Sequence, residues 1–173
     1  MNEKKILMVI APRNFRDEEI LRPKKIFEDS GAEVVVASTS TGTAMGMLGA
    51  RIDPDISLDQ VDAKDYDAIV VVGGGGSKQY LWDNALLQDI VREAHGEGKV
   101  VAAICISPVV LAKAGLLKGK EATVFPSSDT HRELEKNGAI ISSQETVVSG
   151  NIVTGRGPES AEEFGYRVIE TLR

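Results

Sequence analysis

Cys105 is the one cysteine of the chain, and its surroundings are typical of a nucleophile. The segment from Ala103 to Pro108 ends an apolar run, passes through small residues and leads into an apolar helical stretch. This pattern predicts a nucleophile elbow, in which a sharp turn lifts the reactive atom above a sheet. The start of the following helix should stabilise the thiolate and lower the pKa of Cys105. A cysteine packed as a small apolar side chain is the alternative, and the local pattern leaves both open.

Three consecutive acids, Asp17, Glu18 and Glu19, follow the first apolar run near the expected start of a helix. In one interpretation they only suit the positive end of the helix dipole. In the other, one carboxyl turns inward, is held protonated by burial and donates a hydrogen bond to the Cys105 thiolate. The residue types therefore allow a thiolate and carboxyl pair without deciding which acid belongs to it.

Four glycines, Gly73 to Gly76, follow another apolar run. Their spacing fits neither the dinucleotide-binding fingerprint nor the P-loop, because the later glycine that each pattern needs is missing. One glycine amide could bind an oxyanion beside Cys105, whereas a flexible turn is the plainer interpretation. The two histidines, His95 and His131, are most simply a helix-end residue and a surface residue. Neither is an obvious catalytic base.

The elements that must position these residues follow from the apolar patterns. Continuous apolar runs at residues 6–11, 34–37, 68–72 and 100–104 are typical of strands buried on both faces of a parallel sheet. Helices are expected at about 17–30, 84–95 and 109–114, and after Ser160. This alternation predicts a layered α/β fold with ligands bound at the carboxyl ends of the strands.

Four local signals refine these elements. Pro23 should kink the first helix or mark its true start, and Gly96 should stop the helix at 84–95. Ser160 and Glu163 have the spacing of a capping box. The segment 149–151 has the composition of a hairpin turn between short strands at 147–148 and 152–153.

Composition limits the class of protein. The 173 residues carry 20 Lys+Arg and 26 Asp+Glu, a formal net charge of −6, and 42% of them are apolar. These values suggest a single domain spanning residues 1–173 and argue against disorder. The acidic balance argues against nucleic acid or an anionic membrane as partner, and no apolar stretch approaches the ~18 residues of a membrane span. One cysteine and two histidines allow no internal disulfide or Cys/His metal cluster, so we expect a cytoplasmic protein without metal or cofactor.

Several segments, taken in order and spacing, resemble the ThiJ/PfpI family over nearly the whole chain. The resemblance implies a flavodoxin-like three-layer sandwich, with a mostly parallel sheet, helices on both faces and a nucleophile elbow at Cys105. It implies Glu19 as the carboxylic partner, an anion pocket made by the amides of Gly75 and Ile106, and a homodimer or higher oligomer. The matching segments are residues 5–11, Glu19 four residues before Pro23, 70–75, 102–105 with Pro108, 111–120 and 151–158.

Two positions depart from the family. Ile106 follows the cysteine where the protease branch has a histidine, and Phe125 precedes Pro126 where the deglycase branch has one. A Cys-His dyad would need His131 or His95 to arrive from elsewhere, or from a neighbouring subunit. A thiol and carboxyl pair is therefore the better prediction.

The leading hypothesis is a Cys105/Glu19 enzyme that acts on small reactive carbonyls, as a glyoxalase or deglycase in stress protection. A non-enzymatic oxidation sensor or chaperone, in which an oxidant converts Cys105 to the sulfenate or sulfinate, is the alternative. A PfpI-type cysteine peptidase, or another hydrolase or hydratase, ranks below these. Peptide hydrolysis needs a base to activate the nucleophile, and both familiar histidine positions are apolar.

Overall fold

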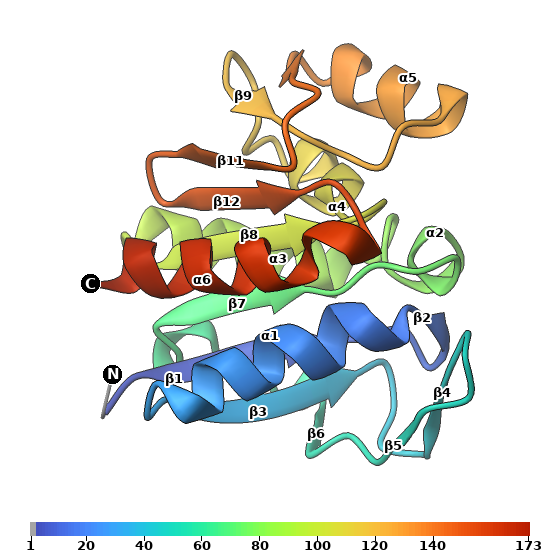
Figure 1. The fold of residues 1–173 in the computed structure, drawn as a ribbon, viewed down its shortest axis with the longest axis vertical. Coiled ribbons are helices and arrows are strands. Elements are labelled where there is room, and N and C mark those ends of the chain that lie inside the picture. The colour runs from blue at the N-terminus through green and yellow to red at the C-terminus, as the bar shows by residue number, and fades with distance from the viewer. Residues whose placement is uncertain (1–2) are drawn as a thin grey trace.

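The computed structural model describes residues 3–173, and its centre is a seven-stranded sheet (Figure 1). Every neighbouring pair of strands is parallel except the antiparallel pair at one edge. The order is β11 (Thr146–Ser149), β12 (Ile152–Gly155), β8 (Val100–Ile104), β7 (Ala68–Val71), β1 (Lys5–Val9), β3 (Glu33–Ser38) and β6 (Ile56–Ser57). The four predicted buried strands are β1, β3, β7 and β8. Apart from the short β6, the parallel strands follow the flavodoxin-like order of two, one, three, four, five along the chain.

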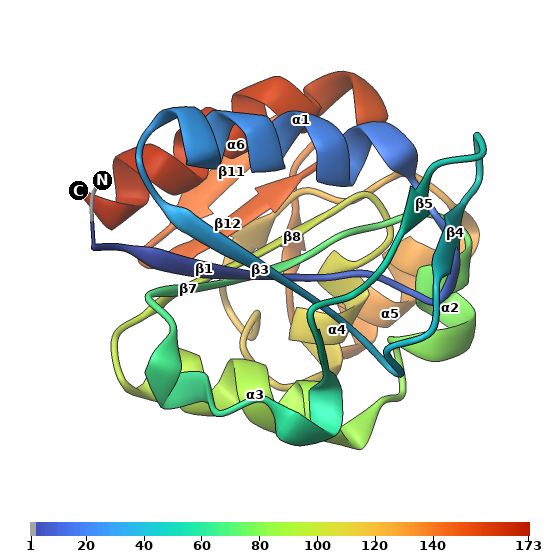
Figure 2. The ribbon, with the colours of Figure 1, turned by 90° about the horizontal axis from the view of Figure 1, so that it is seen from below.

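Helices cover both faces of this sheet, which confirms the predicted three layers (Figure 2). The helices α1 (Asp17–Asp29) and α6 (Ala161–Leu172) lie side by side on one face. The other face is covered by α3 (Ala85–Gly96) and α4 (Pro108–Lys113), with α5 (Ser128–Lys136) packed on α4. A short helix, α2 (Gly76–Tyr80), follows the glycine segment after β7.

Strand β1 and its extension show why the apolar runs do not alternate. Ile6, Met8 and Ile10 point into the core beneath α1 and α6, whereas Leu7, Val9 and Ala11 point into the core on the α3 and α4 side. All six side chains are fully buried. A strand with a core on each face must be apolar at every position, as predicted.

Short strands extend the fold beyond the main sheet. One small sheet joins β2 (Arg13–Phe15), β4 (Ala44–Gly46) and β5 (Arg51–Ile52), and the other pairs β9 (Glu121–Ala122) with β10 (Ile140–Ile141). Single 3-10 turns lie at Leu58–Gln60, Ala63–Asp65 and Pro158–Ser160. The β2-β4-β5 sheet is attached at the carboxyl end of β1, next to the start of α1 (Figure 1).

One of the local predictions is narrowed by the structure, and two need correction. Helix α1 begins at Asp17 and runs through Pro23, so the proline is not the start of the helix. Helix α3 includes Gly96, and Gly98, with a φ of +78°, is the residue that leaves the helical conformation. Ser160 accepts no capping hydrogen bond, and its hydroxyl donates to Glu145.

The hairpin prediction is confirmed. β11 and β12 pair antiparallel with Val148 opposite Val153, and Gly150 takes a positive φ of +60° in the turn between them. Across residues 3–173, no helix combines the length and apolar character needed to cross a membrane.

Candidate active site

Three neighbouring strands, β1, β7 and β8, end at one edge of the sheet and bring together residues that are far apart in the sequence. Cys105 follows β8 directly, with a φ of +66°, a left-handed conformation that few residues other than glycine adopt. Its amide donates to Gly155 O at 2.9 Å, and its carbonyl accepts from the Phe125 amide at 2.8 Å. These bonds on both sides fix the strained turn that the elbow pattern predicts.

Glu19 lies in the first turn of α1 and is fully buried, with 0% of its surface exposed. Its Oε1 accepts a hydrogen bond from the Gly73 amide at 3.0 Å. The other oxygen, Oε2, is buried without a hydrogen-bond partner among residues 3–173. One carboxylate oxygen is therefore anchored, and the other is left available beside Cys105.

The two neighbouring acids have different environments. Glu18 turns outward and binds Arg16 through two hydrogen bonds, of 2.8 and 2.9 Å. Asp17 is buried and accepts from the amides of Leu48 and Ala50, so it holds the loop between β4 and β5. Of the three acids, only Glu19 points inward to the end of the sheet.

Gly73 shows how closely Cys105 and Glu19 approach each other. A Cβ atom at Gly73 would lie 2.4 Å from the Cys105 Cβ and 2.5 Å from the Glu19 Oε1, both far inside van der Waals contact. Only a residue without a side chain leaves room for the thiol and the carboxyl at this point.

Burial dominates the electrostatics of this pair. It raises the pKa of Glu19 to about 8, although contacts with Cys105 and the Gly73 amide oppose the rise. The carboxyl is therefore protonated at neutral pH, and Oε2 is the oxygen free to carry the proton. Cys105 lies within range of this carboxyl, but no hydrogen bond of good geometry joins the two groups.

The expected lowering of the Cys105 pKa is wrong. Cys105 is only 7% exposed, and burial, followed by the charge of Glu19, raises its pKa to about 12. The amides of Gly74 and Ile106 act in the opposite direction but do not outweigh the loss of water. Helix α4 begins three residues after Cys105 and is six residues long, so its dipole is a weak source of stabilisation.

Two backbone amides lie next to the Cys105 sulfur, one from the loop after β7 and one from the loop after β8. Ile106 is one of them, as the family resemblance implies, and Gly74 is the other. Gly75 is the next residue, at the start of α2, and a side chain there would meet nothing within 4 Å. The suggested role of the Gly75 amide is not tested by this geometry.

A buried pair of serines joins these two loops and was not predicted. Ser107 Oγ donates to Val72 O at 2.7 Å, so the 2.7 Å contact between the two hydroxyls must have Ser77 as donor and Ser107 as acceptor. Both serines are fully buried. The signal in the sequence is a small polar residue shortly after each of two adjacent strands, too weak to interpret alone.

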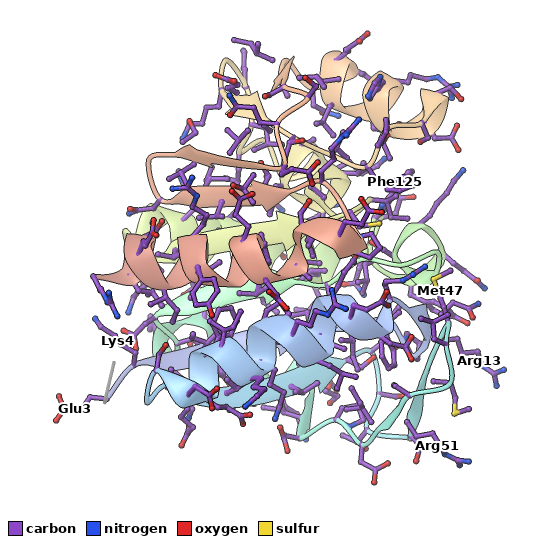
Figure 3. The ribbon with its side chains drawn as sticks, viewed as in Figure 1. Glu3, Lys4, Arg13, Met47, Arg51 and Phe125 are labelled. Carbon is purple, nitrogen blue, oxygen red and sulfur yellow. The ribbon has the colours of Figure 1, made fainter. Side chains whose placement is uncertain are left out.

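The histidines lie away from Cys105. His95 is in the last turn of α3, whose end leads into the opposite edge of the sheet, and His131 is on α5. Neither is among the groups that shift the Cys105 pKa. Phe125, at the position where the deglycase branch has a histidine, is 43% exposed, and Figure 3 shows it at the same end of the molecule as Met47.

A cavity of about 480 Å³ opens beside this edge of the sheet. Arg16, Glu18 and Arg22 of the α1 region form one wall. The remaining lining residues are Phe125, Pro126, Glu145, Arg156, Gly157, Pro158, Glu159 and Ser160. In residues 3–173, no group of three or more His, Cys, Asp or Glu side chains is arranged to hold a metal ion.

Comparison with known proteins gives one consistent family. Residues 4–171 match the model of the DJ-1/PfpI family. An uncharacterized protein of Methanocaldococcus jannaschii is 49% identical over 99% of this chain and 84% of its own length. A Pyrococcus horikoshii protein named as a deglycase is 32% identical, over 98% of this chain and 99% of its own. A Caenorhabditis elegans protein named as a glutathione-independent glyoxalase is 26% identical, with 98% and 89% covered.

A solved structure supports the same assignment of the fold. The crystal structure of a ThiJ/PfpI domain protein from Brachyspira murdochii superposes with a TM-score of 0.93. It is 38% identical to this chain, with 99% of this chain and 98% of the other covered.

Proposed function

The chain belongs to the DJ-1/PfpI family, and from that premise we propose that it is a glyoxalase- or deglycase-type enzyme that uses Cys105 and Glu19 on small reactive carbonyls. The observation that carries the proposal is the unpartnered Oε2 of a fully buried carboxyl beside a buried thiol. A carboxyl with a pKa of about 8 can both give and take a proton near neutral pH.

An α-oxoaldehyde such as methylglyoxal suits this pair. The sulfur of Cys105 forms a bond to the aldehyde carbon, and the carbonyl electron pair moves to oxygen. The protonated Glu19 carboxyl gives its proton to that oxygen as it takes the proton of the thiol, so the carboxyl is protonated again at the end of the step. The amides of Gly74 and Ile106 stabilise the charge that develops on that oxygen. Because proton transfer accompanies attack, the reaction does not depend on a resting thiolate.

The later steps need no oxidant. Glu19 moves a proton from the former aldehyde carbon to the neighbouring carbon, and the hydroxyl proton on the first carbon passes to the former ketone oxygen. The first carbon is thereby oxidised to a thioester while the former ketone carbon is reduced to an alcohol. Water then cleaves the carbon–sulfur bond, releasing a hydroxy acid and restoring the thiol. The net reaction adds one water molecule to the substrate.

Two other features complete the proposal. We expect a homodimer in the cytoplasm, and the supporting observation for the dimer is a set of large exposed apolar side chains on α1 and around β4. These are Leu21, Met45, Met47 and Leu48, the last 64% exposed. The oxidation-sensor alternative needs an ionised, accessible thiol at rest, and the burial and raised pKa of Cys105 disfavour it.

The test is the release of lactate from methylglyoxal by the purified protein. Cys105→Ala and Glu19→Gln should abolish it, while Glu28→Gln, an exposed change at the far end of the same helix, should not. No lactate from the wild type, together with a stoichiometric gain of two oxygens on Cys105 at low peroxide, would refute the enzyme and favour the sensor.

A further inference from the structure

The cavity adjoins Cys105 through Phe125, whose amide donates to the Cys105 carbonyl, and neither Cys105 nor Glu19 is among its lining residues. It is larger than methylglyoxal requires. Its volume of about 480 Å³ is within the range of pockets that enclose ligands many times larger than a three-carbon aldehyde, roughly 300–1,000 Å³. A substrate that fills it must carry a further substituent beyond the reacting carbonyl. The charges on the walls indicate what that substituent is.

The α1 wall of the cavity has an excess of positive charge. Glu18 is the one carboxylate there, and Arg16 binds both of its oxygens. The pKa of Glu18 is lowered, first by this hydrogen bond from Arg16 and further by the charge of Arg22. Arg22 itself makes no ion pair or side-chain hydrogen bond within residues 3–173. Two guanidinium groups thus face one carboxylate, and one positive charge is left without a partner.

The opposite wall has the reverse imbalance, with Arg156 as its one cation and Glu145 and Glu159 as its two carboxylates. Arg156 lies 3.9 Å from Glu145, which also accepts the hydroxyl of Ser160. Glu159 is exposed and precedes the N-terminus of α6, where the helix dipole stabilises a carboxylate. Of the three arginines that line the cavity, Arg16 and Arg156 each contact a carboxylate, and Arg22, on the same helix as Glu19, does not.

We propose that the substrate is an α-oxoaldehyde with a carboxylate at the end of a short chain. The aldehyde reacts at Cys105, and the carboxylate binds at Arg22 and the neighbouring Arg16. This inference rests on the proposed function and adds the substrate class to it. The bonds made and broken are those described above, and the product is a hydroxy acid with a second carboxylate.

The experiment compares 4,5-dioxopentanoate, which carries such a carboxylate, with methylglyoxal, which does not. The quantity measured is the ratio of the two kcat/KM values. The wild type should favour dioxopentanoate, and Arg22→Gln should lower the ratio about tenfold, as expected for the loss of one charged hydrogen-bond donor. Arg92→Gln on α3, on the other face of the sheet, is the matched control and should leave the ratio unchanged (Figure 2).

Glu18→Gln should move the ratio in the opposite direction. It removes the carboxylate that competes for Arg16, so the wall becomes more positive and the preference for dioxopentanoate should rise. General damage to the fold would not change the ratio in opposite directions in the two variants. A ratio that is the same in the wild type, Arg22→Gln and Glu18→Gln would overturn the proposal.

A second readout separates this inference from the proposed function. Glutarate, an unreactive dicarboxylate, should slow the alkylation of Cys105 by iodoacetamide in the wild type and do so less in Arg22→Gln. If neither aldehyde is consumed but glutarate still protects through Arg22, the proposed reaction fails and the carboxylate site stands. If methylglyoxal is consumed but glutarate gives no protection, the reaction stands and the carboxylate site is refuted.

Discussion

Replacing Glu19 by glutamine should change the way in which the free energy of unfolding depends on pH. The carboxyl is fully buried and its pKa in the folded protein is raised from an ordinary 4.5 to about 8. Below pH 4.5 both the folded and the unfolded states hold the proton. Between pH 4.5 and 8 the unfolded state loses it and the folded state keeps it, so the wild type loses stability as the pH rises.

The size of this loss follows from the pKa difference. At about 1.4 kcal/mol for each unit of pKa, the wild type should lose up to about 5 kcal/mol between pH 4.5 and 8 through this one group. Glutamine does not ionise, and its side-chain oxygen can still accept the Gly73 amide. Glu19→Gln should therefore match the wild type near pH 5 and be the more stable protein near pH 8.

The assay is urea unfolding followed by circular dichroism at pH 5 and pH 8, with Glu28→Gln as the control. The difference between Glu19→Gln and the wild type, compared at each pH, removes the contributions of other titrating groups. The reasoning is refuted if both proteins lose the same stability between the two pH values. That result would mean that Glu19 is already ionised in the folded protein.

Three further predictions concern the surroundings of the pair. Gly73→Ala should destabilise the protein by about 1–3 kcal/mol in urea unfolding, because the added Cβ would meet Cys105 and Glu19. Gly75→Ala should be close to neutral, because the space around that position is open. Ser107→Ala should lower the free energy of unfolding by about 1–3 kcal/mol, because it leaves the Ser77 hydroxyl and the buried Val72 carbonyl without hydrogen-bond partners, and Ser77→Ala should lower it less. Equal losses in the two variants would contradict the assigned direction of the hydrogen bonds. Alkylation of Cys105 by iodoacetamide should keep accelerating above pH 9, because burial raises its pKa to about 12, and a plateau near pH 9 would contradict that environment.

The fold was predictable because the sequence is locally consistent. Each of the four central strands is a continuous apolar run, and no other common arrangement buries both faces of a strand. The errors lie at helix ends. Ser160 has the spacing of a cap, but Glu145 accepts its hydroxyl from a segment that is distant in the sequence. Local patterns contain no information about such tertiary partners.

The site was predictable in part. Cys105 carries a strong elbow signal, and the distance of Glu19 from Pro23 distinguished it from Glu18 through a family resemblance. The sign of the Cys105 pKa shift was not predictable, because it depends on how deeply the thiol is buried. The charge excess at Arg22 depends on which carboxylate Arg16 binds, and the sequence offers Arg16 three adjacent acids.

The burial of the only cysteine makes the thiol a reporter of opening motions. In the unfolded chain Cys105 has an ordinary pKa near 8.5 and full access to solvent. In the folded protein only 7% of it is exposed, between segments that follow three separate strands, so labelling is slow and accelerates when those segments move apart. The labelling rate at different denaturant concentrations then measures how often the edge of the sheet opens, either alone or as part of global unfolding. With no second thiol in the chain, all of the label is at this one edge of the sheet.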